Sequence, residues 1–151
     1  MTKIRLDQNI WLLVCDAKKA LLLQNAGDHA YPKLETRHVM EHLLHRSQEL
    51  GSDAPGRMIN SAVGRGVAMD EGDPHQEEER VFLRTVTGDL KRRIEDGEIK
   101  DIIVIAPPRA LGLLRELKCE KLTRAIVAEL PHDYVKLPLY EIEKRLKALA
   151  A

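Results

Sequence analysis

Residues 99–117, IKDIIVIAPPRALGLLREL, are the stretch that decides the fold. The continuous apolar run Ile102–Ile105 is typical of a strand that is buried on both faces. Two prolines follow, and neither can donate to a sheet ladder, whereas Pro108 has the fixed φ of a first helical position. Leucines then recur at helical spacing as far as Leu117. The pattern predicts a strand, a tight turn and a helix, which together begin a βαβ crossover.

Upstream of this stretch, the sequence predicts a three-stranded meander. Residues 9–16, NIWLLVCD, form an apolar strand, and residues 20–24, ALLLQ, follow after so short a link that only an antiparallel hairpin fits. Residues 33–40 alternate between two faces, which is typical of a third strand. The residues expected to share one face of that strand are Leu34, Thr36, His38 and Met40. We expect the second strand to be the antiparallel one.

A glycine-rich segment separates the meander from the main helix. Five of the nine glycines lie in residues 51–72, so we expect a long loop at about 41–72. Loops of this length in compact domains are usually functional or disordered. The main helix begins at Asp73-Pro74, because Asp suits an N-cap and Pro the first helical position, and it ends at Gly97.

The C-terminal part completes the sheet. We expect a helix over residues 119–130, a short strand over residues 133–137, DYVKL, and a last helix that opens at Pro138. The element order β-β-β-α-β-α-α-β-α then predicts one α/β domain over residues 1–151. Its architecture is three-layer α/β/α with a five-stranded mixed sheet, a ribonuclease-H-like arrangement.

Composition narrows the class of protein. The chain has 24 Lys+Arg and 24 Asp+Glu, so a strongly basic nucleic-acid binder is not the default, although a local patch is compatible with this balance. One Trp, one Phe and three Tyr are too few for an aromatic platform that stacks single-stranded nucleic acid. Cys15 and Cys119 do not make a disulfide framework. Because we find no signal peptide and no membrane span of roughly 20 apolar residues, we expect a cytoplasmic protein.

The residues favour no catalytic, metal or cofactor site. A two-metal nuclease needs clustered carboxylates, but Asp16 closes the first strand and Asp101 opens the central one, so parallel strands would hold them at opposite ends. His38, His42 and His45 have helical spacing, but His38 belongs to a strand, and no further ligand completes a zinc set. No G-x-S-x-G elbow marks a hydrolase nucleophile.

The role of the glycine-rich segment is the question that the sequence leaves most open. Gly64-Arg65-Gly66 is too short for a P-loop, and it is either a flexible turn or an exposed tip that brings Arg65 to an anion such as RNA phosphate. Arg57 offers a second guanidinium in the same segment. The candidate partner- or phosphate-binding residues are Arg57, Gly64, Arg65, Gly66 and Arg109.

Four segments resemble the bacterial host attachment family, whose members are described as required for attachment to host cells. The segments are WLLVCDAKKALLL at 11–23, ELGSDAPGR at 49–57, DPHQEEERVFLRTVTGDL at 73–90 and APPRALGLLREL at 106–117. That family is distantly similar to the middle domain of archaeal and eukaryotic class 1 peptide release factors and to ribosomal proteins S11 and L18. The resemblance therefore implies the same scaffold.

In the release factors, a Gly-Gly-Gln loop precedes the long helix. Here the corresponding residues 63–68 read VGRGVA and lack the glutamine that would position a hydrolytic water, so the resemblance does not imply peptide release. It implies a non-enzymatic interaction protein with an unidentified protein partner. The alternatives are an RNA- or ribosome-associated, translation-related factor and a hydrolase whose site the sequence does not show. The sequence indicates neither an oligomeric state nor a host.

Overall fold

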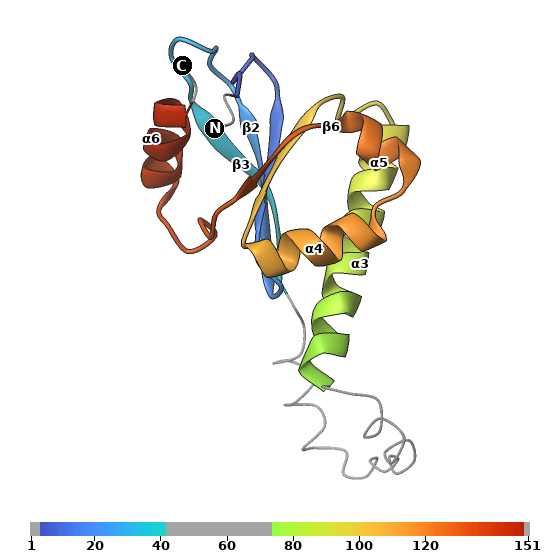
Figure 1. Ribbon diagram of the computed structural model, residues 1–151. Coiled ribbons are helices and arrows are strands. Elements are labelled where there is room, and N and C mark those ends of the chain that lie inside the picture. Colours follow the sequence, from blue (N-terminus) through green and yellow to red (C-terminus); the bar gives the residue numbers. More distant parts are fainter. Residues whose placement is uncertain (1–3, 42–73, 150–151) are drawn as a thin grey trace, which may run out of the picture.

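The structure is a computed structural model that describes residues 4–41 and 74–149. These residues form a five-stranded mixed sheet in the order β3-β2-β1-β5-β6, with helices on both faces (Figure 1). The strands are β1 (Trp11–Cys15), β2 (Lys19–Asn25), β3 (Leu34–Glu41), β5 (Ile102–Ala106) and β6 (Ile126–Pro131). The helices are α3 (Pro74–Glu95), α4 (Pro108–Leu117), α5 (Glu120–Ala125) and α6 (Leu139–Leu149). The predicted α/β class with a five-stranded mixed sheet is confirmed.

Strands β1 and β5 pair in parallel, from Trp11 opposite Ile102 to Val14 opposite Ile105, and every residue of both strands is buried. Strand β6 is parallel to β5, whereas β2 runs antiparallel to both β1 and β3. The predicted burial of the Ile102–Ile105 strand and the antiparallel direction of the second strand are both confirmed.

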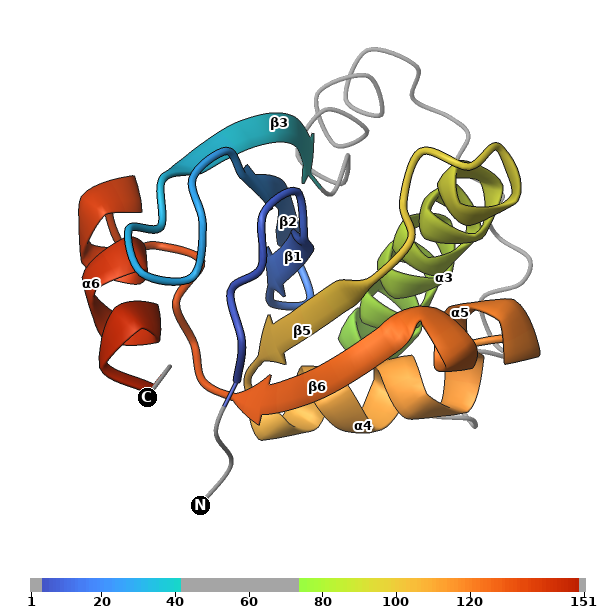
Figure 2. The same cartoon turned by 90° about the horizontal axis from the view of Figure 1, so that it is seen from above.

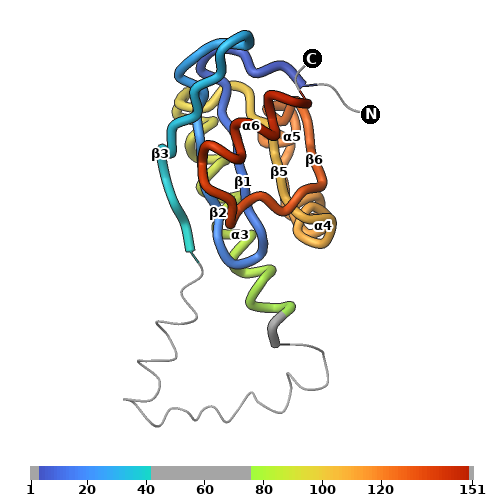
Figure 3. Tube along the Cα trace, turned by 90° about the vertical axis from the view of Figure 1, so that its left-hand side faces the viewer, coloured from blue at the N-terminus to red at the C-terminus, as the bar shows by residue number. Residues whose placement is uncertain are grey.

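Helices cover the two faces of the sheet unequally. Helices α3, α4 and α5 pack on one face, and α6 packs on the other together with the segment that precedes β1 (Figures 2 and 3). Side chains alternate between these two cores, so that Leu13 and Val104 point to the first and Leu12 and Ile103 to the second. Each fully buried aliphatic side chain contributes about 1.5–3 kcal/mol, and this two-sided burial holds the sheet together.

Helix α3 begins at Pro74, which agrees with the predicted start, while the proposed N-cap Asp73 lies outside the described residues. The helix ends in a Schellman motif. Gly97 has a φ of 82°, and the N–H of Glu98 donates to the carbonyl of Arg93 at 2.9 Å. Glycine is favoured at this position because an L side chain is strained at positive φ.

The prediction of a helix over 119–130 and a strand over 133–137 is wrong. Helix α5 ends at Ala125, and β6 follows it directly, while residues 133–137 contain no strand. The apolar β5 offers a free parallel edge, and β6 pairs along it as far as Pro131. This tertiary pairing, helped by two β-branched residues at the start of β6, outweighs the helical spacing of the segment.

The expectation that Leu34 and Met40 share one face of the third strand is also wrong. The register between β2 and β3 shifts between Leu22 and Leu23, which leaves Arg37 as an extra, bulged residue. A one-residue shift exchanges the two faces of a strand. Leu34 therefore packs in the core under α6, whereas Met40 packs against the core under α3.

Asn25 is fully buried and joins the segment before β1 to the connection between β2 and β3. Its Nδ2 donates to the carbonyl of Leu6 at 2.7 Å. Its Oδ1 accepts hydrogen bonds from the N–H of Gly27 at 3.0 Å and from the N–H of Lys33 at 2.8 Å. Without this side chain, each buried backbone group would lack a partner, at a cost of roughly 1–3 kcal/mol per group.

Asn25→Leu should therefore lower the free energy of unfolding by roughly 2–5 kcal/mol, because an apolar side chain of similar size leaves those groups unpaired. Chemical denaturation measures the change. Thr36→Val, at an exposed position on β3, is the control and should change the free energy of unfolding by less than about 0.5 kcal/mol. An unchanged unfolding midpoint for Asn25→Leu would show that the hydrogen bonds of Asn25 do not hold the meander.

Two glycines on α3 and at its end should respond oppositely to alanine. Gly88 lies in the middle of the helix, and a Cβ built on it meets nothing within 4 Å. Gly88→Ala should raise the free energy of unfolding by about 0.5–1 kcal/mol. Gly97→Ala should lower it by about 1 kcal/mol, because Gly97 has positive φ. Thermal unfolding of the two variants checks both signs, and shifts in the same direction would contradict the assigned backbone conformations.

Candidate functional site

The carboxyl ends of the parallel strands β1, β5 and β6 meet at one edge of the sheet, and the C-terminal end of β3 lies there as well (Figure 1). The N-terminal ends of α3 and α4 reach the same end of the molecule (Figure 1). In open α/β sheets, ligands bind outside the carboxyl ends of the strands, where the strand order reverses. Here the order reverses at β1, which continues to β2 on one side and pairs with β5 on the other. This edge is therefore the first place to look for a site.

Of the five residues that the sequence singled out, the structure describes Arg109. The other four fall between the end of β3 and the start of α3, outside the described residues, and they are Arg57, Gly64, Arg65 and Gly66. The structure thus brings one predicted residue to the sheet edge, and the grouping of all five stays a prediction.

Arg109 lies in the first turn of α4, and its Nη2 is 2.8 Å from Oε1 of Glu79 on α3. The Glu79 side chain is 17% exposed, and Oε1 has no hydrogen bond of good geometry, so the contact is an ion pair without a directed hydrogen bond. A second ion pair, from Arg80 to Glu116 at 3.0 Å, joins the same two helices. Arg109 therefore helps to hold α4 on α3, and Glu79 offsets its charge.

Two carboxylates considered for metal chemistry lie apart, as expected. Asp16 follows the carboxyl end of β1 and accepts hydrogen bonds from the N–H groups of Lys18 and Lys19, both at 2.8 Å. Asp101 precedes the opposite end of the parallel neighbour β5. Within the described ranges 4–41 and 74–149, no three His, Cys, Asp or Glu residues are grouped to hold a metal ion.

His38 belongs to an ionic cluster that joins β3 to the C-terminal end of α3. Nη1 of Arg93 is 2.9 Å from Nε2 of His38 and 3.1 Å from a carboxylate oxygen of Glu98. Nε of Arg93 donates to Asp89 at 2.7 Å. Burial disfavours the charged guanidinium, but the carboxylates of Asp89 and Glu98 outweigh it and raise the pKa of Arg93. The cluster fastens the edge strand to the helix.

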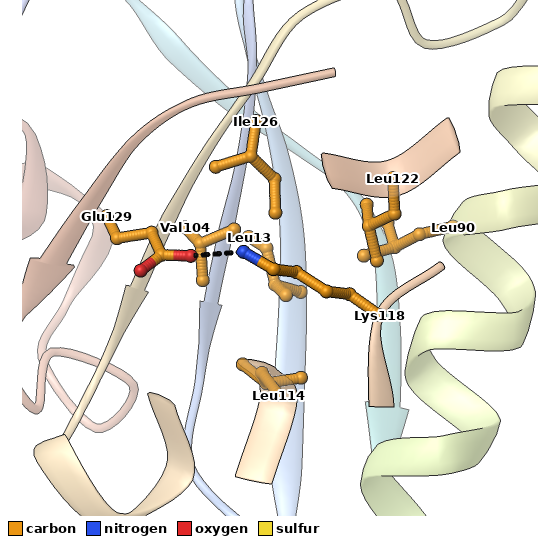
Figure 4. A pocket seen from close by; sticks show the side chains of 8 residues that line it. All are labelled: Leu13, Leu90, Val104, Leu114, Lys118, Leu122, Ile126 and Glu129. Carbon is orange, nitrogen blue, oxygen red and sulfur yellow. Dashed lines mark hydrogen bonds and ion pairs between the residues drawn. The ribbon is translucent and has the colours of Figure 1, made fainter. Parts of the chain in front are cut away.

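A second cluster surrounds Glu129, which sequence reasoning missed because it assigned this residue to a helix. One carboxylate oxygen accepts from Nε of Arg115 at 2.9 Å. The other accepts from Nζ of Lys118 at 3.2 Å, as Figure 4 shows. Burial works against the charge of Glu129, but these two hydrogen-bonded cations hold its pKa below the ordinary value of 4.5.

Glu129 and Lys118 lie at the rim of an apolar cavity of about 10 Å³ between α3, α4, α5 and the sheet (Figure 4). The other lining residues are Leu13, Leu90, Val104, Leu114, Leu122 and Ile126. A cavity of roughly 10–15 Å³ is the least that holds one water molecule. This cavity is therefore a packing defect rather than a substrate site.

The outer face of α3 carries cations that point away from the core. We define this face by the exposed residues between positions 81 and 92, which are Val81, Arg84, Thr85, Gly88, Lys91 and Arg92. The carboxylate in this stretch is Asp89, whose side chain is 15% exposed and which pairs with Arg92 and Arg93. Between positions 81 and 92 the outer face of α3 thus presents three cations and no exposed carboxylate, while the exposed Glu77 and Glu95 lie about one turn beyond its two ends.

Comparison with known proteins identifies a family and distantly similar solved structures. The sequence profile of a family described as "Protein required for attachment to host cells" matches residues 11–146. Among curated proteins, no sequence matches the chain. In the parts of the chain that the structure describes, no helix is long and apolar enough to cross a bilayer.

Two of the similar solved structures are of Dom34 from S. cerevisiae, described as a translation termination-like factor involved in RNA quality control pathways and interacting with Hbs1. The selenomethionine-labelled form has a TM-score of 0.40 at 12% identity, with 92% of this chain and 35% of that chain covered. The unlabelled form has a TM-score of 0.38 at 12% identity, with 95% and 37% covered. The chain thus spans little more than a third of the length of the yeast structures.

The Glu129 cluster should make stability depend on pH. Because the pKa of Glu129 is lower in the folded state than its ordinary value of 4.5, the unfolded chain takes up a proton first as pH falls. The free energy of unfolding of the wild type should then decrease as the pH falls below about 4.5. The free energy of unfolding of the Glu129→Gln variant should decrease less steeply over the same range. Denaturation curves between about pH 2.5 and 7 measure both slopes. Equal slopes would contradict a stabilising role of the ionised carboxylate.

Proposed function

The chain belongs to the family of proteins required for attachment to host cells, and we propose on this basis that it is a non-enzymatic interaction protein that acts in bacterial attachment. The observation that carries the proposal is the extent of the family match. It runs over residues 11–146 and so includes every strand of the sheet and all but the end of α6.

The geometry of the described residues supports a role in which exposed side chains bind a partner. The best-formed polar clusters join secondary-structure elements, as Arg109 with Glu79 joins α4 to α3 and Glu129 with Arg115 joins β6 to α4. We therefore assign the function to exposed side chains, and among the clustered residues only to Arg109, whose side chain remains 61% exposed.

The proposed contact residues are the arginines that sequence analysis singled out. Arg57 and Arg65 carry the charges, with Gly64 and Gly66 flanking the second of them. Arg109 contributes at the edge of the sheet, because its side chain is 61% exposed and Glu79 occupies one side of the guanidinium. A guanidinium has five N–H donors, so the others remain for a partner.

The proposal includes a cytoplasmic location, from which the protein would influence attachment indirectly through an unidentified protein partner. Cell fractionation tests this part alone. If the protein is recovered on the cell surface, the indirect role is wrong and the protein contacts the host directly.

Deletion of the gene in the native organism should lower the number of cells that attach to the host, and the full chain should restore it. The triple variant Arg57→Ala, Arg65→Ala and Arg109→Ala should accumulate normally but restore attachment poorly. The control Lys136→Ala, Lys144→Ala and Lys147→Ala also removes three cations and should restore attachment fully. Normal attachment of the deletion strain would rule out the proposed function.

A second candidate function is association with RNA or ribosomes, as a translation-related factor without the Gly-Gly-Gln motif. The observation that favours it is the outer face of α3, with its three cations and no exposed carboxylate. We expect the native protein to sediment with ribosomes or RNA in a low-salt gradient. We also expect added salt to release it. Sedimentation as a free protein at low salt would exclude this candidate.

A further inference from the structure

We infer that the outer face of α3 binds double-helical RNA, with its cations on the phosphates and Thr85 on a ribose 2′-hydroxyl. The inference rests on the second candidate function and names the surface, the residues and the class of RNA. It depends on three observations of the described residues, which are the position of Gly88, the distribution of charge and the hydrogen bond of Thr85.

Gly88 lies in the middle of the outer face. With 3.6 residues per turn, Arg84 and Lys91 lie along one side of Gly88, and Thr85 and Arg92 lie along the other. Arg84 and Lys91 are about 10 Å apart along the helix axis, at 1.5 Å per residue. The cations therefore flank the exposed backbone of Gly88.

Packing does not account for a glycine at this position. A Cβ on Gly88 would meet nothing within 4 Å, and the residue is exposed in the interior of a 22-residue helix. Glycine is unfavourable inside a helix, and it recurs where a ligand approaches the backbone closely. Gly112 in α4 is equally open but half-buried, so it is the exposure of Gly88 between cations that we attribute to a partner lying against α3.

The positive charges on the outer face of α3 favour a polyanion as its binding partner. Within the described residues, Arg84 makes no ion pair, and Arg92 remains 63% exposed although it pairs with Asp89. Lys91 is exposed and acts on Glu95 only through its charge. Glu95 lies one turn beyond Lys91, outside the outer face, and its charge is shared between Lys121 at 3.0 Å and Lys91, which leaves Arg84 without a neighbouring carboxylate partner among the described residues. Cations spaced along a strip match the repeated phosphates of a nucleic acid.

Thr85 distinguishes RNA from DNA. Its hydroxyl donates its proton to the carbonyl of Val81 at 3.1 Å, so it has none left to offer a phosphate. The hydroxyl oxygen can still accept a hydrogen bond, and the sugar–phosphate backbone of DNA has no donor. The 2′-hydroxyl of RNA is such a donor, and it is displayed in the wide, shallow minor groove of the A-form helix.

Other polyanions fit the face less well. A lipid surface needs an apolar stripe, but the apolar side of α3 is buried in the core, and the outer face offers Val81 alone. Single-stranded nucleic acid needs aromatic residues for base stacking, and the outer face has none. A double helix, which presents phosphates and ribose rather than unstacked bases, is the form that suits this face.

Fluorescence anisotropy with a labelled RNA duplex of about 20 base pairs, at low salt, tests the inference on the full chain. The wild type should bind, and Arg84→Ala with Lys91→Ala should weaken the affinity at least tenfold. It should also lower the slope of log K against log salt by roughly 2, one for each lost phosphate contact. The control Lys144→Ala with Lys147→Ala makes the same charge change on the exposed side of α6 and should change the affinity less than twofold.

Two further variants test Gly88 and Thr85. Gly88→Gln adds a neutral side chain to the outer face and should weaken binding several-fold. Gly112→Gln is its control, because Gly112 also lies inside a helix with nothing within 4 Å of its Cβ position. Thr85→Val should lower the preference for the RNA duplex over a DNA duplex of the same sequence.

The outcomes separate this inference from the function on which it rests. Failure of the wild type to bind the RNA duplex at low salt overturns the inference, and the absence of any RNA or ribosome binding removes the second candidate function too. Wild-type affinity in Arg84→Ala with Lys91→Ala overturns the inference alone, because RNA then binds elsewhere. Equal affinity for RNA and DNA duplexes overturns the assigned role of Thr85 and the choice of RNA.

Discussion

The parallel pairing of β1 with β5 is the constraint on which the rest of the structure depends. All residues of both strands are buried, so the pair requires cover on both faces of the sheet. Helices α3, α4 and α5 supply it on one side, and α6 with the segment before β1 supplies it on the other. This requirement fixes which side of each helix turns inward. It leaves the outer side of α3 without a packing role, so its composition is free to serve binding.

The sequence predicts those helices and strands whose type and ends are determined by residues within the element or next to it. Continuous apolar runs mark β1 and β5, and Pro108 and Gly97 mark a helix start and a helix end. Strand β6 was missed because its residues have helical spacing and its conformation is decided by pairing with β5. The bulge at Arg37 was missed for the same reason, since a register is a property of two strands.

The candidate site was harder to predict than the fold because its residues take their roles from partners distant in sequence. Arg109 stands next to a helix start, where it suggests an anion site, but Glu79 in another helix offsets its charge. Glu129 is likewise paired with residues of α4 and the connection after it. Sequence alone shows the charges, and the fold decides which of them stay available to a partner.

A net charge of zero describes the chain as a whole and conceals this local difference. On α3, the Asp89 side chain is largely buried and the cations of the outer face stay exposed, so a chain without net charge carries a local cationic strip there. The same strip holds Gly88, which costs stability in a helix and gains nothing from packing. Places where a sequence departs from local structural preference without a packing reason are commonly functional. The charge distribution and the backbone therefore point independently to one surface, although neither carries a recognisable motif.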